Sequence, residues 1–370
     1  MSLPIESRAY GVTRDGQLID QYTLRNNHGV EVSVINFGGI VTCWRVPDNK
    51  AEHVDIVLGY DSLEQYESCQ IYMGCIAGRF ANRIANATFE LDGQRYYLEA
   101  NNNGHHLHGG PDGFHKAVWA AQVESVVGPI SVAGTELTTS SRLVLEHTSE
   151  DGHGGYPGSL SVRVAYALCD DNRLTIDYEA TTDKPTVVNL TSHAYFNLRG
   201  HQYAENHGVL EHELEIASTD FIPTSKHGIP LPSVQSVVGT PMDFRSPMMV
   251  GDRLFTEDSQ LSAGAGYDHT WVLRGDQSSI CKDLTFAARL TDKQSGRQLE
   301  VHTSQPGLQF YVANHVRQCS GKSGIIYDQY GSICLETQHF PDSPNRSDFP
   351  ATVLRPGEIL CERTVYQILF

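Results

Sequence analysis

The stretch Val162-Arg-Val-Ala-Tyr-Ala-Leu168, the turn formers Asp170-Asp-Asn172 and the stretch Arg173-Leu-Thr-Ile-Asp-Tyr-Glu179 predict two strands joined as a hairpin. Apolar residues alternate with polar ones in both halves, which is the period of a half-buried strand. Other stretches of the same kind lie at 30–35, 88–98 (with Asp92-Gly93 as a type I′ turn), 297–302, 308–312 and 332–336. Many short strands separated by turns indicate an all-β sandwich or barrel.

Helical signals are few in this chain. The stretch 61–66, capped by Asp61, and the stretch 247–261 are predicted as short helices. The 370 residues contain no repeat of 20–50 residues, no low-complexity tract and no linker. Because all-β architectures often exceed the average domain length, we expect one domain over residues 1–370.

The charge balance bears on the partners. The chain is 40% hydrophobic, 19% charged and carries a formal net charge of -17. Because the sequence has no Lys/Arg cluster, this negative charge disfavours binding to nucleic acid and to anionic membranes. It also argues weakly against a phosphorylated substrate. The sequence has no stretch of about 18 consecutive apolar residues, so no membrane-spanning helix is predicted. Nothing in the sequence indicates a protein partner.

The compartment is predicted from the thiols and the first residues. Residues 1–8 lack the apolar core of a signal peptide. Eight cysteines are scattered without a Cys-x-x-Cys pair, so we expect free thiols and a cytoplasmic protein. The cysteines are Cys43, Cys69, Cys75, Cys169, Cys281, Cys319, Cys334 and Cys361.

Two stretches carry groups suited to proton transfer. Asn189-Leu-Thr-Ser-His193-Ala-Tyr-Phe-Asn-Leu198 places an imidazole in a strand-like run, where it is either a hydrogen-bonded core residue or an acid–base group. Ser332-Ile-Cys-Leu-Glu336 places a carboxyl among apolar residues, where it is either paired or functional. Partial burial would raise the pKa of Glu336 towards the range of a useful base.

A metal site is a second interpretation, suggested by His106 and His108. On a strand, two histidines two residues apart share a face, as the metal ligands of a cupin do. The cupin pattern also needs a nearby Glu and a distant third His, and here Gly109-Gly-Pro-Asp112 follows instead. The alternatives are a loop histidine bonded to its neighbours, or a His108 that binds a polar ligand.

Three further stretches are ambiguous by themselves. Gly78-Arg-Phe-Ala-Asn82-Arg83 holds two arginines that are either ion-pair partners or donors to ligand oxygens. Asp268 follows the glycine-rich loop 263–266, where most aspartates are turn residues. Gln305, before Pro306-Gly307, is a plausible turn residue.

Taken together and in order, these motifs resemble the aldose 1-epimerase family. The resemblance spans about residues 10–370, and only Ser192 and Ser304 depart from the commoner Asn and Thr. The motifs and flanking signals lie at 78–84, 107–110, 189–198, 221–224, 228–230, 240–245, 267–269, 305–307, 335–345 and 354–358.

The resemblance implies a fold, a reaction and a set of site residues. It implies a large antiparallel β-supersandwich that interconverts the α and β anomers of free aldohexoses such as D-glucose and D-galactose, with no cofactor and no metal. His193 corresponds to the general acid and Glu336 to the general base. The residues implied in sugar binding are Asn82, Arg83, His108, Tyr195, Asp268 and Gln305.

Three alternatives stay open at this point. A non-catalytic carbohydrate-binding relative on the same scaffold would usually lack the acid or the base. A hexose-phosphate epimerase should carry additional basic residues for the phosphate. A metal-dependent sugar isomerase of the cupin type needs ligands that the sequence does not supply at that spacing.

Overall fold

The computed structural model describes residues 4–47, 53–126, 130–132, 135–137, 141–205, 207–273 and 284–370. Within these ranges the chain is mostly strand, and the all-β prediction with few short helices is confirmed. Every strand pair that forms a sheet there is antiparallel, as expected for strands joined by hairpins and short loops.

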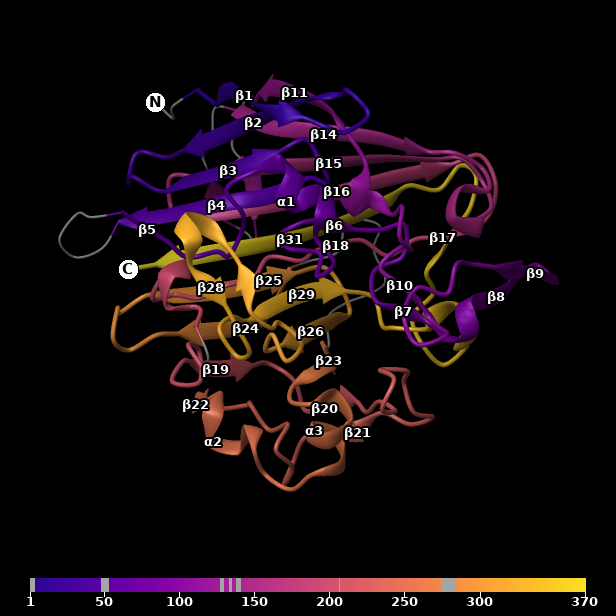
Figure 1. Cartoon of the computed structure of the whole chain (residues 1–370). Helices are drawn as coiled ribbons and strands as arrows, with labels where there is room; N and C mark the ends of the chain where they lie inside the picture. The colour runs from indigo at the N-terminus through magenta and orange to yellow at the C-terminus, as the bar shows by residue number, and fades with distance from the viewer. Residues whose placement is uncertain are drawn as a thin grey trace.

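The largest sheet has nine strands and forms the long layer seen across Figure 1. Its central part is the predicted hairpin, in which Leu168 pairs with Leu174 across a turn that ends at Asn172 in left-handed conformation. In spatial order the strands are β11 (Ala120–Ser125), β14 (Ser141–Ser149), β15 (Leu160–Leu168), β16 (Arg173–Thr182), β31 (Leu360–Leu369), β25 (Gln298–Thr303), β24 (Thr285–Thr291), β19 (Glu213–Ile216) and β22 (Met248–Met249).

Two smaller sheets have five strands each. The first consists of β1 (Glu6–Val12), β2 (Leu18–Arg25), β3 (Glu31–Ile35), β4 (Ile40–Pro47) and β5 (His53–Asp55). The second, called the site sheet below, consists of β21 (Gln235–Ser236), β20 (Asp220–Ile222), β23 (Asp268–Val272), β26 (Gly307–Tyr311) and β29 (Cys334–Gln338).

Two-stranded ribbons and short helices complete the described structure. The ribbons pair β6 (Ile76–Ala77) with β18 (Thr191–Ser192), β7 (Arg83–Ile84) with β10 (His106–Leu107), β8 (Thr88–Leu91) with β9 (Gln94–Tyr97), β12 (Ile130–Val132) with β13 (Thr135–Leu137), β17 (Thr186–Val187) with β30 (Val353–Leu354), and β27 (Cys319–Ser320) with β28 (Ile326–Tyr327). The α-helices are α1 (Leu63–Ser68), α2 (Gly251–Leu254) and α3 (Ser259–Gly264). The 3-10 turns are Ala85–Ala87, Phe114–Lys116, His153–Gly155, His201–Tyr203, Lys322–Gly324 and Ser343–Asn345.

Both smaller sheets pack on the same face of the nine-stranded sheet. The ring of Tyr366 on β31 lies edge-on to Trp44 of β4 at 6.3 Å, and its hydroxyl donates to the carbonyl oxygen of Leu335 on β29. Thr364, two residues earlier on β31, contacts Thr337 of β29 through their hydroxyls. Residues two apart share a face of a strand, so one side of β31 touches both smaller sheets. The arrangement is a sandwich with a continuous apolar core.

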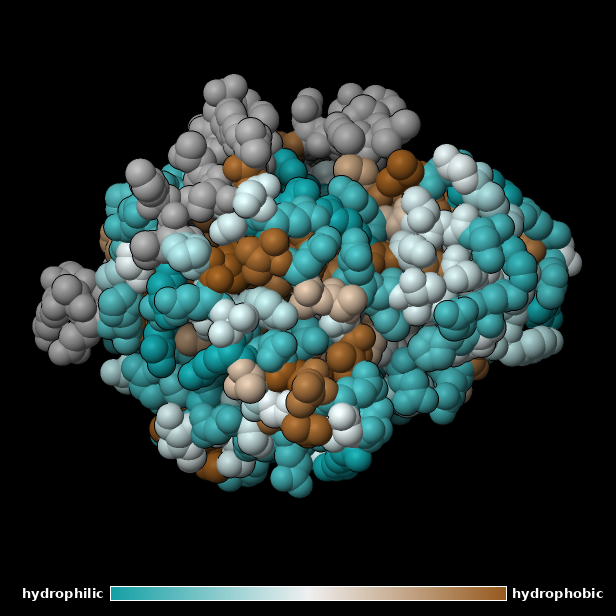
Figure 2. Space-filling model, turned by 90° about the horizontal axis from the view of Figure 1, so that it is seen from above, coloured by the Kyte–Doolittle hydropathy of each residue, from teal (hydrophilic) through white to brown (hydrophobic). Residues whose placement is uncertain are grey.

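The opposite face of the nine-stranded sheet is polar and carries ion pairs. Arg163 of β15 contacts Glu124 of β11 and Glu179 of β16, while Arg363 of β31 contacts Asp177 of β16. Figure 2, which views the molecule from above over β1 and β11, shows a mainly hydrophilic surface with small apolar areas between. The apolar residues that alternate with these charged ones, such as Val162, Val164 and Ile176, are buried.

The local predictions hold for the hairpins and need correction for the helices. Asp92 and Gly93 both have positive φ, 51° and 78°, as a type I′ turn requires. The first helix begins one residue later than expected and is capped by Ser62, whose hydroxyl accepts from the Gln65 N–H. The predicted helix 247–261 is wrong as one element, because β22, α2 and α3 share that region and Asp258 caps α3.

The described helices are short. None of them has both the length and the apolar character needed to cross a membrane.

Candidate active site

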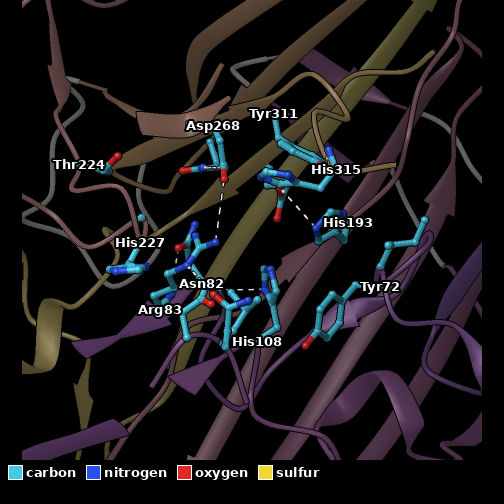
Figure 3. Close-up of a pocket in the computed structure, with 18 of the residues that line it drawn as sticks. Tyr72, Asn82, Arg83, His108, His193, Thr224, His227, Asp268, Tyr311 and His315 are labelled. Atoms are coloured by element: carbon cyan, nitrogen blue, oxygen red, sulfur yellow. Dashed lines mark hydrogen bonds and ion pairs between the residues drawn. The ribbon is translucent and has the colours of Figure 1, made fainter. Parts of the chain in front are cut away.

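A cavity of about 340 Å³ opens over the site sheet and gathers nearly all of the predicted site residues. Strands of this sheet supply Asp268, Gln309, Tyr311 and Glu336. These four belong to one face, since Asp268 pairs with Tyr311 and Gln309 pairs with Glu336. Figure 3 shows Arg83, Asn82, His108 and Tyr72 on the facing side, contributed by an earlier part of the chain.

Strand alternation explains why Glu336 points into this cavity. Its neighbour Thr337 contacts β31, so Glu336 projects from the opposite face of β29. The residue is 2% exposed, and its Oε2 has no hydrogen-bond partner among the described residues. Burial raises the pKa of Glu336 well above 4.5, the charge of Asp268 raises it further, and Arg83 acts against both. Glu336 is therefore a carboxyl that holds its proton tightly.

The backbone of His193 is fixed by hydrogen bonds on both sides of the peptide. Its N–H donates to the carbonyl oxygen of Cys75 at 2.8 Å, and its carbonyl oxygen accepts from the N–H of Gly74 at 3.0 Å. The imidazole stacks on Tyr195 with 5.0 Å between ring centroids and lies parallel to Tyr72 at 6.2 Å. Two tyrosine rings thus hold the imidazole in one plane.

The two groups predicted to transfer protons meet in the cavity. The Nε2 of His193 lies 3.7 Å from the Oε1 of Glu336. Burial lowers the pKa of His193 from 6.5 to about 4, although a backbone hydrogen bond and Asp268 oppose the shift. Since the pKa of Glu336 moves the other way, the pair holds one proton, and in the free site that proton is on the carboxyl.

Arg83, Asp268 and Gln309 form a polar wall beside the pair. The Arg83 guanidinium lies 4.0 Å from the Asp268 carboxylate, whose Oδ1 accepts from the Gln309 amide at 2.6 Å. Gln309 in turn accepts from the Thr270 hydroxyl. Gly228 covers the guanidinium closely: a Cβ at this position, where φ is +74°, would lie 2.6 Å from the Arg83 Cζ. Gly228 therefore packs against the Arg83 guanidinium at the cavity wall.

Asn82 and His108 hold each other through their backbones. The Asn82 N–H donates to the Nδ1 of His108 at 3.1 Å, and the His108 N–H donates to the Asn82 carbonyl oxygen at 3.0 Å. Both residues have positive φ, 64° and 50°. Burial, with smaller effects of His193 and Arg83, lowers the pKa of His108 well below 6.5, so the ring is neutral. With Nδ1 as acceptor, the proton sits on Nε2, and His108 offers a donor.

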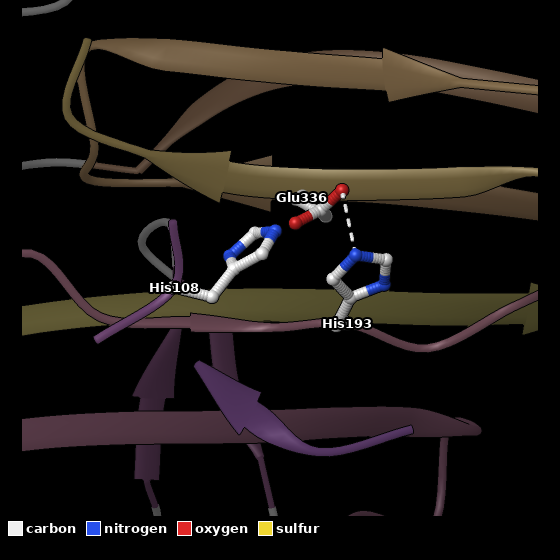
Figure 4. A group of neighbouring side chains, drawn as sticks. All are labelled: His108, His193 and Glu336. Atoms are coloured by element: carbon white, nitrogen blue, oxygen red, sulfur yellow. Dashed lines mark ion pairs between the residues drawn. The ribbon is translucent and has the colours of Figure 1, made fainter. Parts of the chain in front are cut away.

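A metal ion is one possible occupant of this donor set. Figure 4 shows the Glu336 carboxyl between the rings of His108 and His193, and the nearest donor atoms of the three residues lie within 4.8 Å of one another. A metal needs an unprotonated ring nitrogen, however, and the Asn82 N–H already occupies the lone pair of Nδ1 in His108. The set therefore fits a hydrogen-bonding site better than a metal site.

The predicted partner in the metal interpretation, His106, lies elsewhere. Its Nδ1 contacts the carbonyl oxygen of Glu99 at 2.7 Å, and its Nε2 contacts the Tyr156 hydroxyl at 2.7 Å. His106 does not line the cavity, whereas His108 does. The alternative interpretation, in which the two histidines share a face for one metal, does not hold, because only His108 lines the cavity and its backbone is left-handed.

Gln305 also needs correction as a sugar-binding residue. Its amide donates to the carbonyl oxygens of Leu190 and Thr337, at 3.0 and 3.1 Å, and the residue does not line the cavity. Gln309, four residues later, is the glutamine at the cavity wall. The signal that could have found it is the period of two along 307–311, combined with pairing to the strand of Glu336.

Two other sequence motifs are resolved by their contacts. Arg79 is a structural residue, since its guanidinium donates to the carbonyl oxygens of Pro157, Gly158 and Ser149. Tyr195 lines the cavity, but its hydroxyl donates to the carbonyl oxygen of Ile71, so its ring supports His193. Tyr72, at φ 57°, was missed because no motif marks it.

A buried carboxyl and a buried imidazole, set in a cavity lined with hydrogen-bonding groups on a β-sandwich, have the chemistry that an acid–base enzyme needs. Comparison with known proteins specifies the class. The family model described as aldose 1-epimerase matches residues 20–367. The chain belongs to this family, whose members are isomerases.

Named relatives and solved structures agree with the family. The chain is 39% identical to galactose mutarotase of Bos taurus (92% of this chain, 91% of the relative) and 38% identical to that of Homo sapiens (93% and 92%). It is 34% identical to aldose 1-epimerase of Escherichia coli K12, over 96% of each chain. The structure of galactose 1-epimerase from Lactobacillus acidophilus superposes with a TM-score of 0.82 at 26% identity, covering 100% and 99% of the chains. The GalM/aldose epimerase homologue from C. elegans gives 0.80 at 28%, covering 94% and 98%. The predicted galactose mutarotase-like fold is therefore confirmed.

Proposed function

We propose that this isomerase interconverts the α and β anomers of free aldohexoses, D-glucose and D-galactose among them, with His193 as general acid and Glu336 as general base. The observation that carries the proposal is the buried pair, 3.7 Å apart, in a cavity lined with donors and acceptors for sugar hydroxyls. Family membership supplies the reaction class.

Ring opening needs one proton removed and one delivered. Ionised Glu336 takes the proton of the C1 hydroxyl while protonated His193 gives one to the ring oxygen, and the ring opens to the aldehyde. Rotation about the C1–C2 bond presents the other carbonyl face. For closure the roles reverse: His193 accepts a proton and Glu336 donates one. The pair carries one proton before and after each half-reaction.

A bound sugar would change the pKa values of Glu336 and His193. Free Glu336 is protonated and free His193 neutral, because burial disfavours both charges. Sugar hydroxyls would supply the hydrogen bonds that the buried carboxylate and imidazolium lack, which favours the charged forms. Arg83 acts in the same direction, since its charge lowers the pKa of Glu336.

The remaining cavity residues have binding roles in this proposal. Neutral His108 donates from Nε2, Asp268 accepts from hydroxyls, and Arg83 and Asn82 complete the polar wall. Gln309 takes the role that sequence reasoning gave to Gln305. Together they must retain the open-chain aldehyde while leaving C1 free to rotate.

Polarimetry on freshly dissolved α-D-glucose and α-D-galactose tests the proposal. The protein should speed the decay to the same final rotation, and Glu336→Gln should lose that effect while remaining folded. No acceleration by the wild type with either sugar would reject anomer interconversion of these sugars. Binding assays across aldoses and sugar phosphates would then separate a carbohydrate-binding protein from a hexose-phosphate epimerase.

Three broader assignments belong to the same proposal. A single domain over 1–370 is supported by one family match over 20–367 and by a core cluster running from Leu24 to Ile368. A cytoplasmic location is supported by cysteines such as Cys43, Cys169 and Cys334, which are free thiols. An aldose is the expected small-molecule partner, and the prediction that nucleic acid and membranes are not partners is checked by gel-shift and vesicle-sedimentation assays.

A further inference from the structure

Cys69 and Cys319, far apart in sequence, meet at the hydroxyl of Tyr60. This hydroxyl lies 3.5 Å from the sulfur of Cys69 and 3.3 Å from the sulfur of Cys319. The two sulfurs therefore both contact the same oxygen atom. Both cysteines are partly exposed, so a small reagent in solvent can reach them. Nothing in the proposed acid–base chemistry uses either thiol.

The two cysteines belong to segments that lead directly into the cavity. Cys69 caps the end of α1, and the next three residues, 70–72, all line the cavity. Cys319 begins β27, four residues after His315, which lines it from the other side. The segments already touch, since the Gln65 amide of α1 donates to the carbonyl oxygen of Ser320.

The surroundings give the two thiols different roles. The ammonium group of Lys116 donates to the carbonyl oxygens of Glu67 and Cys69, so a positive charge lies beside Cys69. Burial raises the pKa of Cys319, which keeps that sulfur protonated. Cys69 is thus the sulfur suited to attack an oxidant first, and Cys319 is suited to resolve the product.

We propose that Cys69 and Cys319 form an oxidisable thiol pair, which a peroxide converts to a disulfide that slows turnover in the adjacent cavity. The Cys69 thiolate attacks one oxygen of hydrogen peroxide, forming a sulfenic acid and releasing hydroxide. The Cys319 sulfur then attacks the Cys69 sulfur, so that the S–S bond forms and the S–O bond breaks. The hydroxyl leaves with the Cys319 thiol proton as water, and the proton that Cys69 gave up on forming its thiolate neutralises the hydroxide of the first step. Two thiols lose two electrons, and one peroxide becomes two water molecules.

The disulfide acts on the cavity through Tyr72. Closing the bond draws the end of α1 towards β27 and removes the Tyr60 hydroxyl from between the sulfurs. Tyr72, three residues from Cys69, is the ring that lies parallel to His193. Since a misplacement of about 1 Å can cost on the order of 100-fold in rate, we expect the disulfide to slow mutarotation by about tenfold or more. This effect on turnover rests on the proposed function, whereas formation of the bond does not.

The experiment treats the full-length, reduced protein with hydrogen peroxide and maps its peptides without reduction. The expected result is a Cys69–Cys319 cross-linked peptide, together with a slower polarimetric rate that dithiothreitol restores. Cys69→Ser and Cys319→Ser should each abolish the cross-link and the peroxide sensitivity. Cys361→Ser, which removes another partly exposed thiol, should keep both.

The outcomes separate this proposal from the catalytic one. A peptide that joins Cys69 to buried Cys75, or sulfenic acid without a cross-link, would overturn the pair. A Cys69–Cys319 cross-link with an unchanged rate would overturn the effect on turnover. If the reduced protein does not speed mutarotation at all, the catalytic proposal fails, and the cross-linked peptide still decides whether the pair exists.

Discussion

Glu124 and Glu336 are both glutamates on antiparallel strands, yet their surroundings move their pKa values in opposite directions. Glu124, on the outer face of the nine-stranded sheet, accepts hydrogen bonds from Arg142 and Arg163, both at 2.8 Å. Desolvation acts to raise the pKa of Glu124, but these two arginines outweigh it and the pKa ends below 4.5. Within the described part of the chain, no pair of arginines donates to Glu336, and this carboxyl keeps its proton.

The difference lies in the partners that each carboxyl is given. On the outer face, charges of opposite sign contact each other directly and stay wet, so they remain ionised and add little to stability. In the cavity, Glu336 lies 3.7 Å from the imidazole of His193, which burial also keeps neutral. A buried carboxyl and imidazole whose charged forms lack hydrogen-bond partners can exchange protons with a ligand. The contrast between the cavity and the outer face can be tested by substitution.

The largest expected effect comes from removing either member of the cavity pair. Glu336→Gln and His193→Asn should each lower kcat by about 10²- to 10⁴-fold, since each removes one proton transfer. Glu124→Gln, the matched change on the outer face, should leave kcat within about twofold, because surface substitutions rarely matter to chemistry. Polarimetric rates of the three folded variants make the test. Near wild-type turnover in either cavity variant would remove that residue from catalysis.

The second effect is a loss of stability in mild acid. Burial lowers the pKa values of six buried histidines, to about 4 for four of them, to about 3 for His115 and well below 6.5 for His108. They therefore stay neutral when folded but titrate near 6.5 when unfolded. Between these values the unfolded chain binds more protons, and stability must fall as the pH falls. Each histidine contributes up to about 1.4 kcal/mol per pH unit. The six are His106, His108, His115, His193, His212 and His269.

Urea unfolding at pH 7.5, 6.5 and 5.5 measures this slope. Glu124 differs from these histidines. Its pKa is lowered in the folded protein, so its contribution to stability is lost only when the pH falls below about 4.5, which is outside the range from pH 7.5 to 5.5. A free energy of unfolding that does not change between pH 6.5 and 5.5 would contradict neutral burial of the histidines.

A third effect separates the two neighbouring glutamines. Gln309→Leu should raise KM by about tenfold, since a hydrogen bond to the charged Asp268 is lost at the cavity wall. Gln305→Leu should leave KM unchanged and cost about 1–3 kcal/mol of unfolding free energy, because two buried carbonyl groups lose their donor. Steady-state kinetics and urea unfolding of both variants make the comparison. The reverse pattern would return Gln305 to the binding site.

The smallest effect is expected on the outer face. Arg142→Met removes one of the two arginines on Glu124 and should change the unfolding free energy by less than about 1 kcal/mol. Urea unfolding in low and moderate salt measures it. A cost comparable to that of Gln305→Leu would mean that the outer ion pairs stabilise the sheet more than their exposure suggests.

The sequence predicted the sheets well because strand signals are local. Alternation along 162–179 and the Asp92-Gly93 turn each need only a few residues, and both were found where expected. The helix at 247–261 failed for a tertiary reason. Met248–Met249 pairs with β19 as an edge strand, which interrupts any helix there.

The site was predictable where a motif carried it and not where packing did. His193, Glu336, Asp268 and Arg83 fall in family motifs, and all of them line the cavity. Gln305 was chosen from a motif position, although pairing register makes Gln309 the residue that faces inward. The tautomer of His108 depends on a contact with the Asn82 N–H, which no spacing rule reveals.

The single proton held by Glu336 and His193 has a consequence for how such an enzyme operates over time. In the proposed mechanism the pair returns to the same protonation total after every opening and every closure, so no exchange with buffer is required between one sugar and the next. Each anomer meets an equally prepared protein, and the direction of flow depends only on which anomer is in excess. Turnover at high substrate should then be insensitive to buffer concentration, as expected of a catalyst that needs no resetting step.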